Sequence, residues 1–294
     1  MCPSIVKIYL MLFFIFITGK CYADSKYECG PKNTLWIYRE GAIEGYSGNC
    51  KNGFISGHGA LYFKSGAYYS GNWKEGNRDG EGMYVWKNGD KYVGTFKEGY
   101  MEGKGTFTSV DGDSYVGDWK HDLRDGKGIM KWKNKDKYDG EWKNGQRNGH
   151  GIFTETRNLS GSTYEGDWKN DKKNGFGFYN YGGLDAVISY KGYWKDDKRD
   201  GKGKGSWGAN VSYDGDWKDG MRDGKGILNE YGHIYNGNFR NDMLHGYVTV
   251  TYKNGGGVEQ EWENGNFIRD IKRYYSTEQT QQKNENEDNF WYED

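Results

Sequence analysis

The chain has 294 residues and a formal net charge of −1, and 34% of its residues are hydrophobic, half of that share being aromatic. A nearly neutral total excludes a strong general attraction to nucleic acid. The 48 glycines lack the strict spacing and the proline of a collagen helix, and disordered chains are poor in aromatics. This composition instead favours a thin β-structure in which aromatic rings supply most of the buried area.

The N-terminus carries an apolar leader. Residues 8–17, IYLMLFFIFI, follow Lys7 and are too few to span a bilayer comfortably. Small residues stand three positions and one position before Asp24, as at a signal-peptidase site. We therefore expect residues 1–23 to be a signal peptide cleaved after Ala23, which places the mature chain in the periplasm or outside the cell. An uncleaved membrane anchor through residues 8–17 is the alternative.

Removal of the leader leaves two cysteines, Cys29 and Cys50. An even pair in an oxidising compartment predicts a disulfide. The bridge would close a loop of about 20 residues and stabilise the fold by roughly 3 kcal/mol. Two free thiols are the alternative, whereas a zinc site would need further ligands such as a nearby histidine pair.

A tyrosine, a glycine and an aromatic residue at alternate positions recur about every 23 residues. Tyr69, Gly71 and Trp73 form one example, and Cys50 stands where most other copies have tryptophan or phenylalanine. A fixed period of this size predicts a repeat array rather than a globular enzyme. The clearest tyrosine–tryptophan pairs, which we expect to be structural, are Tyr69 and Trp73, Tyr115 and Trp119, Tyr138 and Trp142, Tyr164 and Trp168, and Tyr213 and Trp217.

Each copy predicts a β-hairpin followed by a short connection. In residues 69–91 the alternating Tyr-Gly-Trp positions point to one face of a first strand. A polar run containing Gly76 then predicts a turn. Gly80 and Gly82 are expected to share one face of the second strand, where they leave bare backbone for the rings to cover.

The combined pattern, YxGxW, a glycine three residues on, and then GxG, resembles the MORN repeat (membrane occupation and recognition nexus). Nine copies cover residues 46–257, and a partial tenth begins at Val258. The resemblance implies an all-β fold, an elongated single-layer antiparallel β-meander of hairpins with a shallow groove. Some 19 strands at about 4.8 Å would form a rod of roughly 90 Å. Caps are expected at 24–45 and 258–275, followed by a disordered polar tail at 276–294.

The residue after the aromatic position is basic in every copy. These residues, which we call the basic ladder, are Lys51, Lys74, Lys97, Lys120, Lys143, Lys169, Lys195, Lys218 and Arg240. Equivalent positions two strands apart lie roughly 10 Å from each other, so the ladder is a candidate site for anions. The alternative is a solvated edge that nearby acids neutralise, and the near-neutral total charge favours it.

Two copies break the period, with added length in 154–163 and 178–189. Insertions in a repeat array map to loops on one face, which is often the binding face. The second insertion is more apolar than its counterparts. It therefore supplies a candidate contact loop, whose side chains are Tyr179, Tyr181, Leu184, Val187 and Ile188.

No motif indicates catalysis, because the chain lacks GxSxG, HExxH and P-loop patterns. We expect no cofactor and no metal. The favoured function is an exported, non-catalytic scaffold that binds a partner protein. A binder of an anionic membrane surface or envelope polymer is the first alternative, and a regulatory module of an enzyme is the second. Exposed edge strands also make a homodimer plausible.

Overall fold

The computed structural model describes residues 43–52, 54–156, 161–182 and 187–275. The predicted signal peptide, most of the N-terminal cap, Cys29 and the C-terminal tail lie outside these residues. Cys50 lies near the end of the first strand. Because Cys29 is outside the described residues, the disulfide between them stays a prediction. The described residues form strands and turns without a helix, which confirms the all-β prediction.

The chain divides into two units. The first runs to Lys133 and adds Trp142–Gly145, and the second comprises Asn134–Glu141 and the residues from Gln146 onward. Strand β9, Lys137–Lys143, contributes residues to both units.

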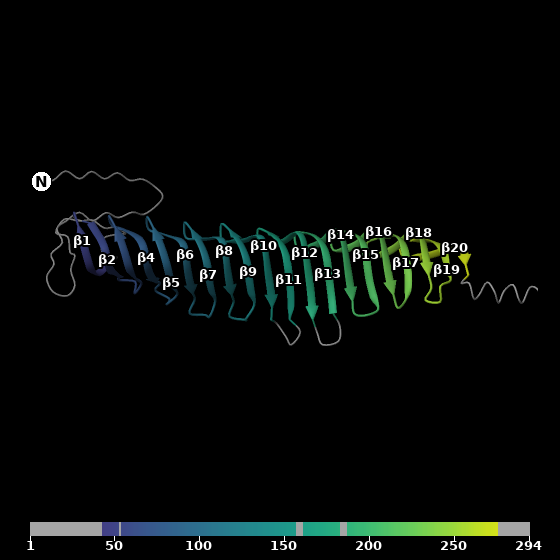
Figure 1. Cartoon of the computed structure of the whole chain (residues 1–294), viewed down its shortest axis with the longest axis horizontal. Helices are drawn as coiled ribbons and strands as arrows, with labels where there is room; N and C mark the ends of the chain where they lie inside the picture. The colour runs from purple at the N-terminus through teal and green to yellow at the C-terminus, as the bar shows by residue number, and fades with distance from the viewer. Residues whose placement is uncertain (1–42, 53, 157–160, 183–186, 276–294) are drawn as a thin grey trace, which may run out of the picture. The chain divides into compact units, whose positions relative to one another are not determined.

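In the first unit every strand pairs antiparallel with the next one along the chain (Figure 1). Its strands are β1 Ile43–Lys51, β2 Phe54–Phe63, β3 Tyr68–Lys74, β4 Asn77–Val85, β5 Lys91–Lys97, β6 Tyr100–Thr108, β7 Ser114–Lys120 and β8 Leu123–Lys131.

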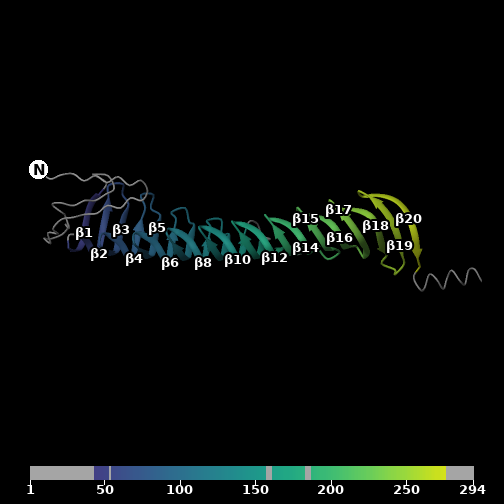
Figure 2. The ribbon, with the colours of Figure 1, turned by 90° about the horizontal axis from the view of Figure 1, so that it is seen from above.

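The second unit continues the same sequential pairing, again as a single layer (Figure 2). After β9 its strands are β10 Gln146–Glu155, β11 Ser162–Lys169, β12 Lys172–Gly182, β13 Val187–Lys195, β14 Lys198–Trp207, β15 Val211–Lys218, β16 Met221–Glu230, β17 His233–Arg240, β18 Met243–Thr251, β19 Gly257–Glu263 and β20 Asn266–Tyr274. The partial tenth copy therefore forms a hairpin of its own, and the described strands number 20 instead of the 19 expected.

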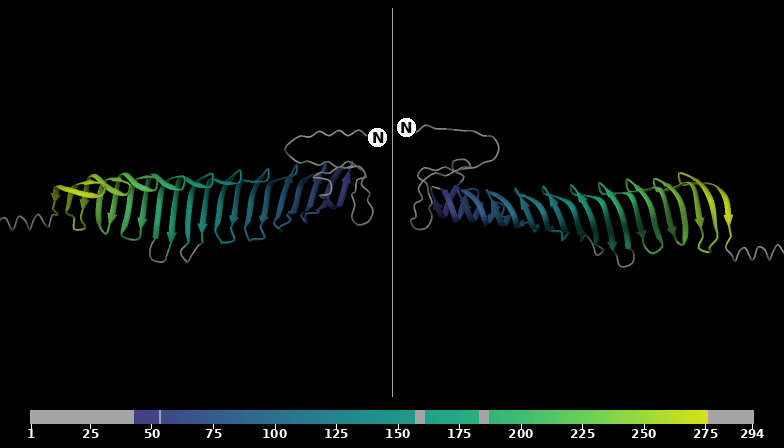
Figure 3. Two further views of the ribbon diagram at one scale, coloured as in Figure 1. Left: turned by 180° about the vertical axis from the view of Figure 1, so that it is seen from behind. Right: turned by 45° about the horizontal axis from the view of Figure 1, so that its top comes forward.

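Tight turns join the odd strand to the even strand of each hairpin. In the copy that starts at Tyr69 the turn consists of Glu75 and Gly76, both with positive φ (48° and 83°). Two-residue turns of this handedness match the twist of the flanking strands, which is why a glycine recurs here. These turns lie at one edge of each unit, and the longer connections between copies lie at the other (Figure 3).

The alternating aromatic residues cover one face of the sheet, as predicted. Tyr92 is fully buried, and its ring makes edge-to-face contacts with Phe96 of its own copy and with Trp119 of the next, at centroid distances of 5.1 and 5.2 Å. Each such pair contributes about 0.5–1.5 kcal/mol beyond its area burial. The repeats are thereby linked by continuous ring contacts, which form what we call the ring face.

The tryptophans of the ring face also bind backbone. Trp119 Nε1 donates a hydrogen bond to the carbonyl oxygen of Gly105, 3.2 Å away, and Trp217 Nε1 donates to Gly203 at 2.9 Å. In both cases the acceptor belongs to the preceding copy. Buried indole N–H groups are therefore satisfied by the same contact that joins one hairpin to the next.

The second glycine of each GxG pair lies directly beneath a tyrosine. A Cβ on Gly82 would be 2.2 Å from Tyr69 Oη and 2.6 Å from its ring, which no side chain could tolerate. Tyr69 Oη meanwhile donates to the Asn72 carbonyl oxygen at 2.9 Å. The predicted cover of rings over bare backbone is confirmed at this position.

The first glycine has another role, which corrects our prediction that both glycines share a face. Gly80 adopts φ +103°, and its Cβ would meet the exposed Asn72 side chain rather than a ring. The strand register shifts between Gly71 and Trp73, as at a β-bulge. The positive φ at the bulge reverses the direction of the Cβ, so Gly80 is required by backbone conformation and Gly82 by packing.

The ninth copy replaces the second glycine by Val248. Together with Val250 and Val258 it forms a buried aliphatic cluster, against which Tyr235 and Trp262 pack. Tyr235 is consequently only half-buried, unlike the earlier tyrosines. Aliphatic packing thus replaces ring-over-glycine packing near β18 and β19, as expected where a repeat adapts to the end of an array.

Candidate functional site

All nine residues of the basic ladder are the last residues of odd strands, and all nine are exposed. They therefore lie at the edge that carries the tight turns. We call this edge of each unit the ladder edge. The structure confirms their alignment, while their affinity for an anion stays a prediction.

Acidic side chains at the ladder edge hold the tight turns. Glu102 accepts a hydrogen bond from the backbone N–H of His121 at 3.0 Å, and Asp125 accepts one from Asn144 at 3.1 Å. The same bond occurs at the other members of what we call the acid column, which comprises Asp79, Glu102, Asp125, Asp200 and Asp223. The spacing of these acids in the sequence indicates charge partners for the ladder and gives no sign of their role in the turns.

The acid column also places negative charge beside the ladder. Asp125 Oδ1 lies 3.4 Å from Lys143 Nζ. The N–H of Asn144, and then Lys143 and Lys120 on either side, hold the pKa of Asp125 below its usual range. An exposed ion pair of this kind contributes little to stability, but it neutralises the ladder locally.

The acid column is interrupted in the second unit. Asn148 and Asn174 occupy the position where five other copies place Asp or Glu and where the first and ninth copies place Ser56 and His245. The Asn148 amide donates to Asn170 Oδ1 at 3.3 Å, so it faces the turn as an acid would. Lys169 and Lys195 are consecutive residues of the ladder. Each therefore lies next to an uncharged amide where other ladder residues lie next to a carboxylate.

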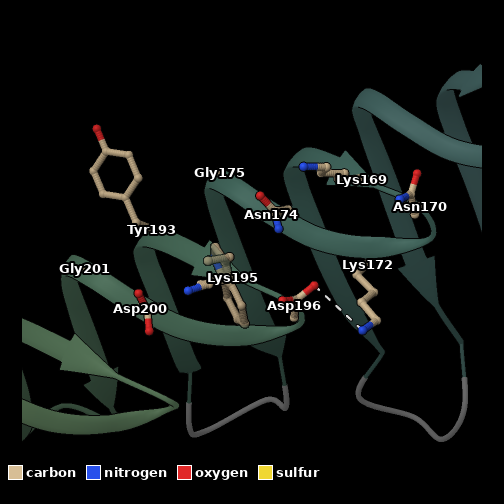
Figure 4. Close-up of a pocket in the computed structure, with 11 residues that line it drawn as sticks. Lys169, Asn170, Lys172, Asn174, Gly175, Tyr193, Lys195, Asp196, Asp200 and Gly201 are labelled. Atoms are coloured by element: carbon tan, nitrogen blue, oxygen red, sulfur yellow. Dashed lines mark ion pairs between the residues drawn. The ribbon is translucent and has the colours of Figure 1, made fainter.

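An open pocket of about 630 Å³ lies at this interruption (Figure 4). Its lining includes Lys169, Lys172, Asn174 and Lys195, from the ends of three adjacent strands, together with the carboxylates Asp196 and Asp200. Figure 4 shows the ion pair between Lys172 and Asp196, whose charged atoms are 3.7 Å apart. Within the described ranges, Lys169 and Lys195 form no ion pair.

A second basic column, which sequence reasoning missed, lies against the ring face. The Arg124 guanidinium sits 4.1 Å from the centroid of Trp142 and donates to the Gly145 carbonyl oxygen at 2.8 Å. Equivalent residues are Arg78, Arg147, Lys173, Arg199 and Arg222. The recurring Arg-Asp-Gly and Arg-Asn-Gly triplets were the available signal. These residues join neighbouring hairpins, so they are structural rather than free to bind a ligand.

The predicted contact loop lies at the edge opposite the ladder. Tyr181 of β12 and Ile188 of β13 are cross-strand partners, and each is exposed to 37%. Tyr179 is half-buried beside Trp194, Val187 opens β13, and Leu184 lies outside the described residues. The two apolar side chains that are exposed are thus adjacent, but nothing in their surroundings identifies a ligand.

The face opposite the rings carries a partly exposed row of apolar and β-branched residues in the first unit. Met83, Val93, Thr106, Val116 and Ile129 are successive register partners across β4 to β8. We call these five residues the aliphatic row. Val93 is exposed to 43% and Val116 to 53%. The other three residues are half-buried. Grouped apolar side chains that remain accessible are typical of a protein contact.

The same row is polar through most of the second unit. Its register partners there include Glu165, Lys191, Lys204 and Asp214. Single exposed apolar residues interrupt these charges: Ile152 lies before the first, Phe178 between two of them and Ile227 after the last. The aliphatic row is therefore a property of particular copies and not of the repeat itself.

Among the described residues, no three His, Cys, Asp or Glu side chains are grouped as metal ligands. Those residues also include no helix with the length and apolar character needed to cross a membrane.

Comparison with known families identifies the class of protein. The MORN repeat model matches residues 46–68, 69–91, 92–114, 115–137, 138–154, 164–183, 190–208, 213–228 and 235–257, which together make up more than half of the chain. The chain belongs to the MORN-repeat family. MORN repeats are generally non-catalytic modules that bind proteins or membranes. A search of curated proteins finds no match to this chain.

Proposed function

We propose that this chain is an exported, non-catalytic scaffold whose first unit binds a partner protein through the aliphatic row. The observation that carries the proposal is a row of five register-paired apolar or β-branched residues, of which Val93 and Val116 are exposed, on a face that the ring packing does not use. The partner would present a flat apolar surface, such as the face of another sheet, since stacked sheets pack about 10 Å apart.

The magnitudes favour this row over the ladder as the protein contact. Burying a side chain such as Val93 or Val116 contributes about 1.5 kcal/mol or more relative to leaving it exposed. An exposed ion pair such as Lys143 with Asp125 contributes about 0–1 kcal/mol. Apolar contacts are also insensitive to salt, whereas a contact made by the ladder would weaken as salt rises.

Site-specific crosslinking tests the proposal. A photo-crosslinking amino acid replaces Val116 in one variant and Asp214 in a matched control, since both occupy the same row. We expect a discrete, salt-insensitive adduct with another protein at position 116 that is lost when Val93 is changed to Lys. Equal crosslinking at both positions would sink the proposal. An adduct between two copies of this chain would make the row a self-association surface instead.

Export is the second part of the proposal, and the leader pattern supports it. The apolar run at 8–17 and the small residues before Asp24 favour cleavage after Ala23 and delivery to an oxidising compartment. There Cys29 and Cys50 would form a disulfide that ties the N-terminal segment to β1. The intact mass of the native protein measures both events: a chain that retains residues 1–23, or a mass that reductant leaves unchanged, would contradict them.

A further inference from the structure

The gap in the acid column places Lys169 in a different charge environment from the ladder residues that lie between two acids. Lys120 lies between Glu102 and Asp125, two carboxylates that hold its neighbouring turns. Lys169 lies between Asn148 and Asn174, so both flanking positions carry amides. Its neighbour Lys195 has Asn174 on one side and Asp200 on the other.

Several acids close to the gap are already engaged. Asp171 accepts hydrogen bonds from Nε of Arg147 and from the backbone N–H of the same residue, at 3.1 and 3.0 Å. Asp196 pairs with Lys172, and Asp197 accepts the backbone N–H of Lys173 at 2.9 Å. Asp200 accepts the N–H of Asp219. These carboxylates therefore already hold turn hydrogen bonds or an ion pair, and no ion pair of the described residues includes Lys169 or Lys195.

We propose that Lys169, Lys195 and the amides of Asn148 and Asn174 form a binding site for a soluble oligoanion bearing phosphate or sulfate groups. Ammonium and amide N–H groups are donors, and such anions offer several acceptor oxygens. Ladder residues two strands apart are roughly 10 Å from each other. Two groups on one ligand can therefore be bound together, which raises the affinity through effective concentration.

The extent of the gap argues for a soluble ligand. A flat membrane surface would meet the whole ladder edge of a unit, including the carboxylate of Asp223, which lies outside the pocket and repels anionic headgroups. A short oligoanion can contact the gap alone. The pocket, which lies between the ends of β11 and β13, provides space for it (Figure 4).

The chain supplies matched variants for the test. The double change Lys169→Gln and Lys195→Gln removes the two ladder charges on either side of Asn174. Its control, Lys97→Gln with Lys120→Gln, removes two ladder charges next to intact acids. A third variant, Asn148→Asp with Asn174→Asp, restores the acid column. Stability should be retained in the third variant, because Asp at this position accepts a turn N–H in other copies.

Binding of the full chain to inorganic polyphosphate and to a sulfated oligosaccharide is measured by titration calorimetry at low and physiological salt. We expect the first and third variants to lose about tenfold or more in affinity, the consequence of losing a single strong contact, and the control to change by less than about twofold. Unfolding midpoints measured in parallel show whether each variant is folded.

Three results would overturn the proposal. Equal losses in the control and in the first variant would show that the ladder acts as a whole. Unchanged affinity in the Asn148→Asp, Asn174→Asp variant would show that the gap is irrelevant. Binding to phosphatidylcholine vesicles that contain phosphatidylserine, without saturable binding to either soluble oligoanion, would place the anion on a membrane.

Discussion

The ring face and the ladder edge are built by the same copies, yet they vary differently along the chain. On the ring face Tyr92 and Tyr190 make contacts of nearly the same geometry, with centroid distances of 5.1 Å to the aromatic of their own copy and 5.2–5.3 Å to that of the next. At the ladder edge Asp125 of one copy becomes Asn174 in another.

The difference follows from what each surface must satisfy. A ring that lies over glycine has no room for another side chain, so a change there alters the fold. An exposed edge residue can change charge at a cost within about 0.5 kcal/mol. Variation at the ladder edge and in the aliphatic row is therefore informative about binding, and uniformity of the ring face is informative about stability.

The largest expected effect distinguishes the two surfaces by their response to pH and salt. Burial raises the pKa of Tyr69, Tyr92 and Tyr115 well above the ordinary value of 10.0. Below that value the phenols are neutral in both states, so their contribution is fully present. Above it the unfolded chain releases protons that the folded chain retains. The free energy of unfolding must therefore fall as pH rises above about 10.

Urea denaturation followed by tryptophan fluorescence measures this effect. The urea midpoint should fall steeply above about pH 10, because every ring-face tyrosine contributes in the same direction. Raising the salt concentration at neutral pH, which screens the exposed ion pairs of the ladder edge, should move the midpoint little. A midpoint that responds to salt and not to alkaline pH would reverse the assignment of stability to the ring face.

A smaller effect, confined to one contact, comes from Gly105→Ala. The new Cβ would be 2.2 Å from Tyr92 Oη and 2.4 Å from the body of its ring, so the tyrosine must move and break its contacts with the next copy. We expect a loss of about 3 kcal/mol, at the upper end for overpacking.

The matched control for this change is Gly45→Ala. Its Cβ would have nothing within 4 Å, and Gly45 is not in the left-handed region. We expect little change or a slight stabilisation there. Similar losses at both positions would show that glycine acts through the flexibility of the unfolded chain rather than through contact with the ring.

The sequence was sufficient to predict the ring face because its requirements recur at fixed spacing. Alternation placed Tyr69, Gly71 and Trp73 on one face, and the glycine beneath the ring followed from the volume of that ring. The role of Gly80 could not be predicted in the same way. A β-bulge depends on the pairing of two strands, and strict alternation gives no sign of the reversed Cβ.

The candidate sites were harder to predict because they depend on register between copies. Asp125 lies beside Lys143 although 18 residues separate them, and only the strand pairing brings them together. The aliphatic row likewise takes one residue from each strand, so no continuous apolar segment marks it. Once the register is known, the exceptions at Asn148 and Asn174 become meaningful.

The smallest predicted effect concerns Lys173. It is the one lysine among the six basic residues that contact the ring face in the described part of the chain, and the other five are arginines. Its Nζ lies 4.8 Å from the Trp194 centroid, and burial lowers the pKa of its ammonium group. Arg199 at the equivalent position lies 4.0 Å from Trp217 and also donates to the Gly220 carbonyl oxygen at 2.7 Å. A planar guanidinium can stack on the ring and reach that carbonyl together, which an ammonium cannot do.

Reciprocal substitution tests whether this column behaves like the ring face or like the ladder edge. Lys173→Arg should stabilise the chain by up to about 1 kcal/mol, through one further hydrogen bond and a closer cation–π contact, and Arg199→Lys should destabilise it by a similar amount. Thermal and urea midpoints of the two variants provide the measurement. If both substitutions change stability by less than the error, the column tolerates exchange as the ladder edge does. Only the tyrosine, glycine and tryptophan positions would then need to keep the same residue in every copy for the fold to be stable.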